Sequence, residues 1–123
     1  MMASFSYRLP WPPSVNSAWR HTGRVTYLTK PQREFRKEVS VISCQTNGGI
    51  RLTRRLAVAL ELIAPNRRKY DIDGRIKAVL DALQHAGIIA DDELIDHLDV
   101  QRLHIEPPGA CDVTITELNG ANA

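Results

Sequence analysis

The residues best suited to chemistry are acidic side chains in two groups. Asp71 and Asp73 lie two residues apart, and Asp91 and Asp92 are adjacent further along the chain. On an extended backbone, residues two apart share a face and lie about 6.6 Å apart, so Asp71 and Asp73 are expected to aim their carboxylates into a common space. Mg2+ binds one or two carboxylates together with waters and substrate phosphates. The pattern therefore indicates a metal site suited to phosphodiester hydrolysis.

Basic residues surround the first acidic pair. The run Arg67-Arg68-Lys69 comes just before it, and Lys77 lies one turn beyond Asp73 if a helix begins there. Lys77 could then neutralise charge in the transition state or orient the attacking water. Residues 1–90 contain fifteen basic and six acidic side chains, whereas residues 91–123 contain one and eight. This asymmetry favours a basic surface for a polyanion beside concentrated carboxylates.

Each of these residues also has an ordinary structural interpretation. Asp73 could be a helix N-cap, and Asp91 or Asp92 could cap a following turn. Lys77 could pair with Asp73 or Asp81 across one helical turn, and the charge runs could be solvated surface. The combination of paired acids with an adjacent basic run favours the metal site over these alternatives.

Other sites with similar motifs are excluded. In a dehalogenase-type phosphatase the D-x-D-G motif directly follows an apolar strand, whereas residues 66–70 intervene here. An EF-hand loop with its glycine at Gly74 would put Lys69 and Leu80 at positions that require acidic ligands. The four histidines lack zinc spacing. Cys44 and Cys111 lack a CxxC partner and are expected to be free thiols in a cytoplasmic protein.

The elements that must position these residues follow from periodicity and turn signals. Apolar residues recur at helical spacing after Thr29 and after Gly74, and they alternate or cluster in the other segments. The predicted fold is a single α+β domain over residues 1–123, a mixed sheet of about four strands with two main helices. Its predicted order is strand 4–9, helix 29–46, strand 56–64, helix 74–86, strand 98–105 and strand 111–118.

Two segments complete this prediction. Residues 14–28 have no regular pattern and are expected to form a mobile loop that carries Arg20 and Arg24 toward phosphates. The longest apolar runs fall well short of the roughly 20 residues that a membrane helix needs, so no membrane segment is expected.

Several motifs, in order over nearly the whole chain, resemble the RusA-type Holliday junction resolvases, small phage and prophage-associated endonucleases. The resemblance covers the basic run, the D-x-D motif with its lysine four residues later, and the later acidic pair. It also includes Leu9-Pro10-Trp11-Pro12-Pro13-Ser14, Asn16, Asp81-Ala82-Leu83, Ala86-Gly87 and Val113-Thr114-Ile115-Thr116-Glu117.

The resemblance implies a homodimer that nicks opposing strands of a four-way DNA junction in recombination and repair, using Mg2+ or Mn2+. It assigns catalysis to Asp71, Asp73, Asp92 and Lys77, with the three aspartates as metal ligands. Asp91 stays open as a ligand, because nothing local selects Asp92 over it. The residues expected to bind DNA are Arg67, Arg68, Lys69, Arg75, Arg20 and Arg24.

Two expectations can be checked against a structure. The three catalytic aspartates should converge within metal-bridging distance. Gly74, where family members commonly have asparagine, puts in question either the helix start or a polar contact beside the metal. The alternative function is a protein that binds branched DNA without cutting it, with its acids serving as caps.

Overall fold

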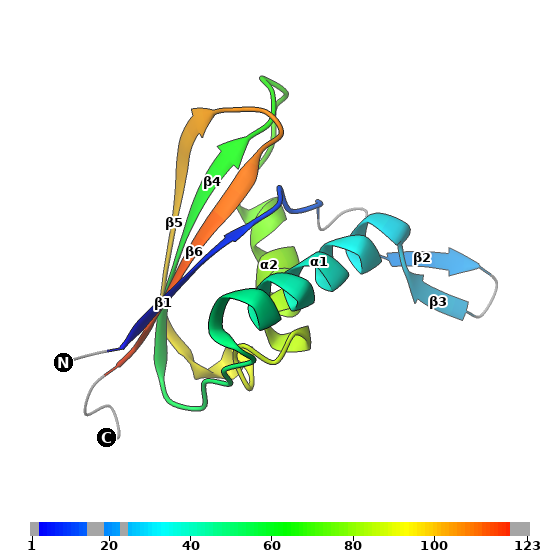
Figure 1. Ribbon diagram of the computed structural model, residues 1–123. Coiled ribbons are helices and arrows are strands. Elements are labelled where there is room, and N and C mark those ends of the chain that lie inside the picture. The colour runs from blue at the N-terminus through cyan, green and yellow to red at the C-terminus, as the bar shows by residue number, and fades with distance from the viewer. Residues whose placement is uncertain (1–2, 15–18, 23–24, 119–123) are drawn as a thin grey trace.

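The computed structural model describes residues 3–14, 19–22 and 25–118, and it shows a mixed four-stranded sheet with two long helices on one side (Figure 1). The predicted α+β class is confirmed. In chain order the elements are β1 (Ser4–Leu9), β2 (Trp19–Thr22), β3 (Val25–Leu28), α1 (Lys30–Asn47), β4 (Leu56–Ala64), α2 (Asp73–His85), the 3-10 turn η2 (Asp92–Leu94), β5 (Ile95–Ile105) and β6 (Ala110–Glu117).

The strand order of the main sheet is β1-β6-β4-β5. β6 pairs antiparallel with both β1 and β4, whereas β5 runs parallel to β4, with Leu56 opposite Ile95 and Ala64 opposite Ile105. Parallel neighbours need a crossover connection, and α2 supplies it between β4 and β5. As a result α2 starts near the carboxyl ends of β4 and β5 and returns to their amino ends.

The hydrophobic core lies between the sheet and the helices. Alternation puts Leu56, Val58, Leu60 and Leu62 on one face of β4, and each is at most 1% exposed. Complete burial of such a side chain contributes about 1.5–3 kcal/mol, so this face determines where the helices pack. Its partners in the core include the helical residues Phe35, Val39, Val79 and Leu83.

A glycine with left-handed backbone angles follows the end of each helix. Gly48, with φ 63°, caps α1, and Gly87, with φ 80°, follows the end of α2. Glycine suits these positions because it lacks the Cβ that penalises positive φ. Among the described residues, no helix combines the length and apolarity that crossing a bilayer requires.

The loop predicted over residues 14–28 contains two short strands. β2 and β3 pair antiparallel, with Trp19 opposite Leu28 and Thr22 opposite Val25, and the hairpin projects from the amino-terminal end of α1 away from the main sheet (Figure 1). The prediction of a segment without regular secondary structure is therefore wrong. Strands of four residues are too short to show an alternating pattern, although threonine, valine and aromatic residues favour extended structure.

Candidate functional site

The D-x-D segment lies at the start of α2, and its backbone is not extended. Ile72 has helical angles, φ −56° and ψ −48°. The N–H groups of Gly74 and Arg75 donate to the carbonyls of Asp71 and Ile72, both at 3.1 Å. The extended geometry expected here is wrong, because the first helical turn already forms at the motif. Asp71 and Asp73 are both exposed near the positive end of the helix dipole, which favours negative charge.

Gly74 has room for a side chain. A Cβ built on it would meet the Cβ of Asp71 at 4.0 Å, which is ordinary van der Waals contact, and its φ is not positive. Packing therefore does not require glycine at this position. The helix start forms despite the glycine. Of the two concerns raised by glycine at this position, the helix start and a polar contact beside the metal, the first is therefore resolved.

Asp92 lies near the opposite end of α2. Its backbone N–H donates to Oε1 of Gln84 at 3.1 Å, and Gln84 is about three helical turns, roughly 16 Å, from Asp73. The strand pairing also places Asp92 and Asp71 at opposite ends of the sheet. β5 begins three residues after Asp92 and its first residue pairs with the first residue of β4, whereas Asp71 lies in the loop beyond the last residue of β4.

The expected convergence of three aspartates within one chain is therefore not found. Across residues 3–14, 19–22 and 25–118, no group of three or more His, Cys, Asp or Glu side chains is arranged to hold a metal ion. The start of α2 offers the two exposed carboxylates of Asp71 and Asp73. This donor set suits Mg2+, which accepts one or two carboxylates and completes its shell with water and substrate phosphates.

The structure distinguishes Asp91 from Asp92. Asp91 is the N-cap of η2, and its Oδ1 accepts a 3.0 Å hydrogen bond from the backbone N–H of Glu93. The capping alternative is thus confirmed for Asp91. The carboxylate of Asp92 is exposed and makes no hydrogen bond or ion pair with any part of the chain that the structure describes. Asp92 is therefore the freer of the two to bind an external ligand.

Arg55 anchors the acidic turn that contains Asp92. Its Nε donates to Oδ1 of Asp96 at 3.0 Å, its Nη1 lies 3.1 Å from Oε1 of Glu93, and its Nη2 donates to the Glu93 carbonyl at 2.9 Å. The hydrogen bonds from Arg55 hold the pKa of Asp96 below its usual value. Because Arg55 directly precedes β4, these bonds fix η2 to the amino end of the sheet.

Lys77 pairs with Asp81, as one of its structural alternatives predicted. Its Nζ lies 3.3 Å from Oδ1 of Asp81, one turn further along α2, and Nη2 of Arg36 lies 3.9 Å from the other carboxylate oxygen. The Lys77 side chain is 62% exposed. Since an exposed i,i+4 pair contributes only about 0.3–0.5 kcal/mol, a nearby phosphate could compete for this ammonium group.

An aromatic and cationic cluster holds the residue before Asp71. The ring of Tyr70 meets that of Trp11 edge to face, with centroids 4.9 Å apart. The guanidinium of Arg102 lies 4.4 Å from the Tyr70 centroid and donates a 3.0 Å hydrogen bond to the Tyr70 carbonyl. Sequence reasoning missed this cluster, because only tertiary packing brings its members together; the tryptophan among prolines was its one visible signal.

Arg75 joins the same cluster from α2. Its guanidinium lies 5.2 Å from the Trp11 ring centroid and 5.9 Å from that of Tyr70, and its Nη1 donates to the Pro12 carbonyl at 2.8 Å. Burial lowers the pKa of Arg75. These contacts within the chain identify Arg75 as a residue that positions the start of α2; its predicted contact with DNA stays a prediction.

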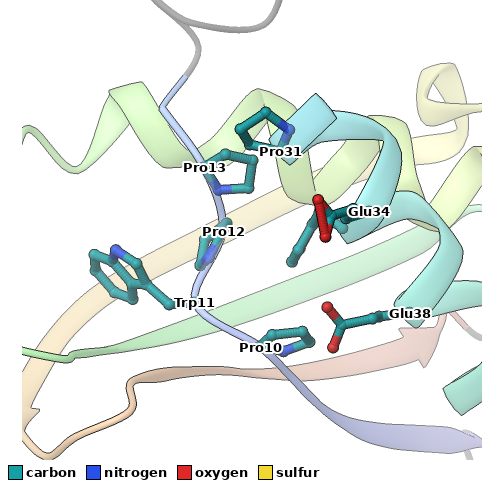
Figure 2. Close-up of a pocket in the computed structure, with 8 residues that line it drawn as sticks. Pro10, Trp11, Pro12, Pro13, Pro31, Glu34 and Glu38 are labelled. Atoms are coloured by element: carbon teal, nitrogen blue, oxygen red, sulfur yellow. The ribbon is translucent and has the colours of Figure 1, made fainter. Parts of the chain in front are cut away.

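The proline-rich segment 10–13 runs between α1 and this cluster. On one side it borders a cavity of about 320 Å3, into which α1 presents Glu34 and Glu38. In Figure 2 these carboxylates lie on the α1 side of the segment, and the ring of Trp11 projects from the other side. The acidic lining makes this cavity a poor site for a polyanion such as DNA.

A second cavity, of about 400 Å3, lies beside the D-x-D segment. Its lining includes Arg68, Lys69 and Asn66 from the loop after β4, together with Trp11 and Tyr70. Positive charge, aromatic surface and an adjacent pair of carboxylates are therefore combined at the carboxyl end of β4. Arg67 is exposed on the same loop. Of the other predicted DNA-binding residues, Arg20 lies in β2 and Arg24 falls outside the described residues.

Comparison with known proteins places these features in context. Residues 10–116 match the family described as "Endodeoxyribonuclease RusA". The chain is 36% identical to a crossover junction endodeoxyribonuclease of Enterobacteria phage HK97, over 95% of this chain and 98% of that protein. It is 34% identical to the protein of that name from Escherichia coli O139:H28 and 32% identical to that from Shigella sonnei, with the same coverage.

Proposed function

The chain belongs to the RusA family of endodeoxyribonucleases, and on that premise we propose that it resolves Holliday junctions by paired, Mg2+-dependent nicks, with Mn2+ able to substitute. The reaction would serve DNA recombination and repair in the cytoplasm of a bacterium or phage-infected cell. The observation that carries the proposal is the pair of exposed carboxylates, Asp71 and Asp73, beside the basic cavity at the start of α2.

Each group has a chemical role in this proposal. Asp71 and Asp73 would hold the cation from the protein side. When bound, Mg2+ acts as a Lewis acid that polarises the phosphate and lowers the pKa of an attacking water. Lys77 lies one turn along the exposed face of α2, where its ammonium can balance charge on the phosphate as the nucleophile adds. The run Arg67-Arg68-Lys69 binds the DNA backbone, which gives a salt-dependent affinity.

The position of Asp92 supports a site shared between two chains. Within one chain this residue lies at the far end of α2 from Asp73, too distant for both to bind one ion. A four-way junction with approximate two-fold symmetry needs two cutting sites, and a two-fold dimer of this chain offers two. In the homodimer that we propose, Asp71 and Asp73 of one protomer meet Asp92 of the other.

A cleavage assay tests the enzyme directly. The wild-type chain, incubated with a labelled four-way junction and Mg2+, should nick opposing strands. Asp73→Asn should abolish nicking and keep or strengthen junction binding, because it removes a metal ligand and one negative charge that faces the phosphates. Asp91→Asn is the matched control, since the Asp91 carboxylate already caps η2 by accepting a hydrogen bond from the backbone N–H of Glu93. Equal cleavage by Asp73→Asn would remove Asp73 from the site.

A mixing experiment tests whether the site is shared. If each site combines Asp73 of one chain with Asp92 of the other, a heterodimer of an Asp73→Asn chain and an Asp92→Asn chain keeps one intact site. Two separately inactive variants should then recover nicking of a single strand on mixing. If all ligands came from one chain, both sites of the mixed dimer would be dead and no nicking would return.

The alternative function is binding of branched DNA without cleavage. One observation favours it, namely that the described part of a single chain holds no group of three metal-binding side chains. Junction binding by wild type without nicking in Mg2+ or Mn2+, at protein concentrations where the chain is dimeric, would establish this alternative.

A further inference from the structure

β5 is an unusually long and open edge strand. It forms one edge of the sheet and extends over eleven residues, yet all of them except Ile95 and Val100 are exposed. Three of the exposed side chains are large and apolar: Leu98 at 39%, Leu103 at 36% and Ile105 at 48%. In Figure 1 its outer side faces away from both helices.

Such an edge presents unpaired backbone N–H and C=O groups that can pair with another strand. Native edges are usually protected by short length, proline, bulges or charged side chains, lysine especially. β5 is long and lacks proline and lysine, and its charged residues are separated into an acidic and a basic half. The opposite edge of the sheet, β1, extends over six residues and buries Tyr7 and Leu9. The exposed apolar surface is therefore concentrated on the β5 edge.

We propose that β5 pairs antiparallel with β5 of a second copy of this chain, so that two sheets join into one. Charge favours this partner and this direction, chiefly through Asp99 and Arg102, because Asp96 already pairs with Arg55 and His104 with Glu106. Acidic Asp96 and Asp99 lie in the first half of the strand, and Arg102 and His104 lie in the second half. Antiparallel self-pairing sets each acidic half beside the partner's basic half, whereas parallel pairing would set like charges together.

Symmetry also limits the register. A two-fold axis normal to the sheet pairs one residue with its own copy, and Val100, midway between Ile95 and Ile105, gives the longest overlap. It also puts two valines face to face, whereas a register centred on Asp99 would oppose two carboxylates. β5 is regular from 97 to 102, with register shifts against β4 only outside that stretch, so the backbone around Val100 is suited to ladder pairing.

This interface would explain how two chains share the proposed site. The inference rests on the proposed function only in that both require two chains. Antiparallel neighbours run in opposite directions, so the start of the partner's β5 comes beside the end of β5. The partner's Asp92 lies three residues before the start of its β5, and Tyr70, next to Asp71, contacts Arg102 near the end of β5. The pairing therefore brings Asp92 of one chain toward Asp71 of the other, as the proposed shared site requires.

Disulfide trapping tests the register. In a Cys44→Ser background, which removes the exposed native thiol, Val100→Cys would place two thiols on directly opposite residues. Cα atoms of such pairs are about 4.5–5.5 Å apart, within disulfide range. Mild oxidation should yield a covalent dimer. Leu98→Cys is the matched control, because its two copies would be roughly 13 Å apart. Cross-linking of Leu98→Cys in preference to Val100→Cys would overturn this register.

Sedimentation of the full chain, without DNA or metal, tests the surface itself. Val100→Arg would oppose two guanidiniums and should raise the dimer Kd roughly a hundredfold, with an unchanged circular dichroism spectrum. Val41→Arg, on the exposed face of α1, should leave the Kd unchanged. A monomeric wild type, or a dimer insensitive to Val100→Arg, would overturn the proposal. A cross-linked but inactive dimer would instead contradict the proposed function and leave the interface intact.

Discussion

The guanidinium of Arg75 lies 5.2 Å from the ring centroid of Trp11 while its Nη1 donates a 2.8 Å hydrogen bond to the neighbouring Pro12 carbonyl. This one side chain fastens the first turn of α2, and with it Asp73, to the segment that follows β1. The acidic motif is therefore held by residues from distant parts of the sequence.

Arg75→Lys should lower the stability of the fold by about 1–2 kcal/mol. Lysine cannot keep the planar stacking and the directed hydrogen bond together. Thermal unfolding would measure the loss, and Arg67→Lys, at an exposed loop position, is the control with no expected change. If Arg75 instead binds DNA directly, the variant would lose junction affinity at an unchanged Tm.

Gly74→Ala should stabilise the protein by up to about 0.5–1 kcal/mol, since alanine restricts the unfolded chain and a Cβ fits beside Asp71. Urea unfolding would measure the change. Gly87→Ala provides the contrast, because its φ of 80° penalises a side chain and stability should fall. A loss of stability in Gly74→Ala would show that the helix start needs glycine.

Gly109→Ala should destabilise the end of the sheet next to the basic cavity. Gly109 has φ 89°, and a Cβ there would lie 2.9 Å from Cδ of Pro65 and 3.0 Å from Cβ of Trp11. Backbone strain of this kind costs about 1–3 kcal/mol. Hydrogen exchange should show faster opening of residues 64–72 than in wild type. Unchanged exchange there would mean that Pro65 and Trp11 shift at no cost.

Arg55→Met should weaken the fold in a pH-dependent manner. Arg55 lowers the pKa of Asp96 in the folded state, so this pair stabilises the fold above the usual aspartate pKa of about 3.9. That contribution is lost as the pH falls below this value. The difference in urea midpoint between wild type and variant should therefore shrink from pH 7 to about pH 3. Arg67→Met should show no such trend, and a constant difference would exclude the ion pair as its cause.

Arg68→Ala and Lys69→Ala should each weaken junction binding and reduce the slope of log affinity against log salt by about 1, as expected for the loss of one phosphate contact. Titration at several salt concentrations measures this slope. Lys37→Ala, on the exposed side of α1, should leave it unchanged. An unchanged slope in Arg68→Ala and Lys69→Ala would place the DNA elsewhere on the protein.

Much of the fold could be predicted because local patterns and tertiary structure agree. The apolar residues of α2 recur at helical spacing, and two of them, Val79 and Leu83, are completely buried. β4 appears in the sequence as an apolar run because the helices cover one of its faces and it is a central strand, paired with β5 and β6 along its two edges. The hairpin β2–β3 was missed, because strands of four residues carry no detectable period.

The site was less accessible to sequence reasoning. The spacing of Asp71 and Asp73 suggested an extended backbone, but α2 begins early and the intervening Ile72 is helical. The choice between Asp91 and Asp92 depended on which of them caps η2, and that is a matter of local backbone geometry. The separation of Asp92 from Asp73 follows from the parallel pairing of β4 and β5. It could not be predicted because no local sequence pattern determines the strand order.

The length of α2, which separates Asp73 from Asp92 within one chain, has a consequence for control of the proposed activity. If the site is divided between two chains as proposed, a newly made chain would not cut DNA until it pairs with another. Below the dimer Kd, the rate of junction cutting should rise with the square of the protein concentration. The level of expression would then act as a threshold, so that a few stray chains leave the chromosome intact.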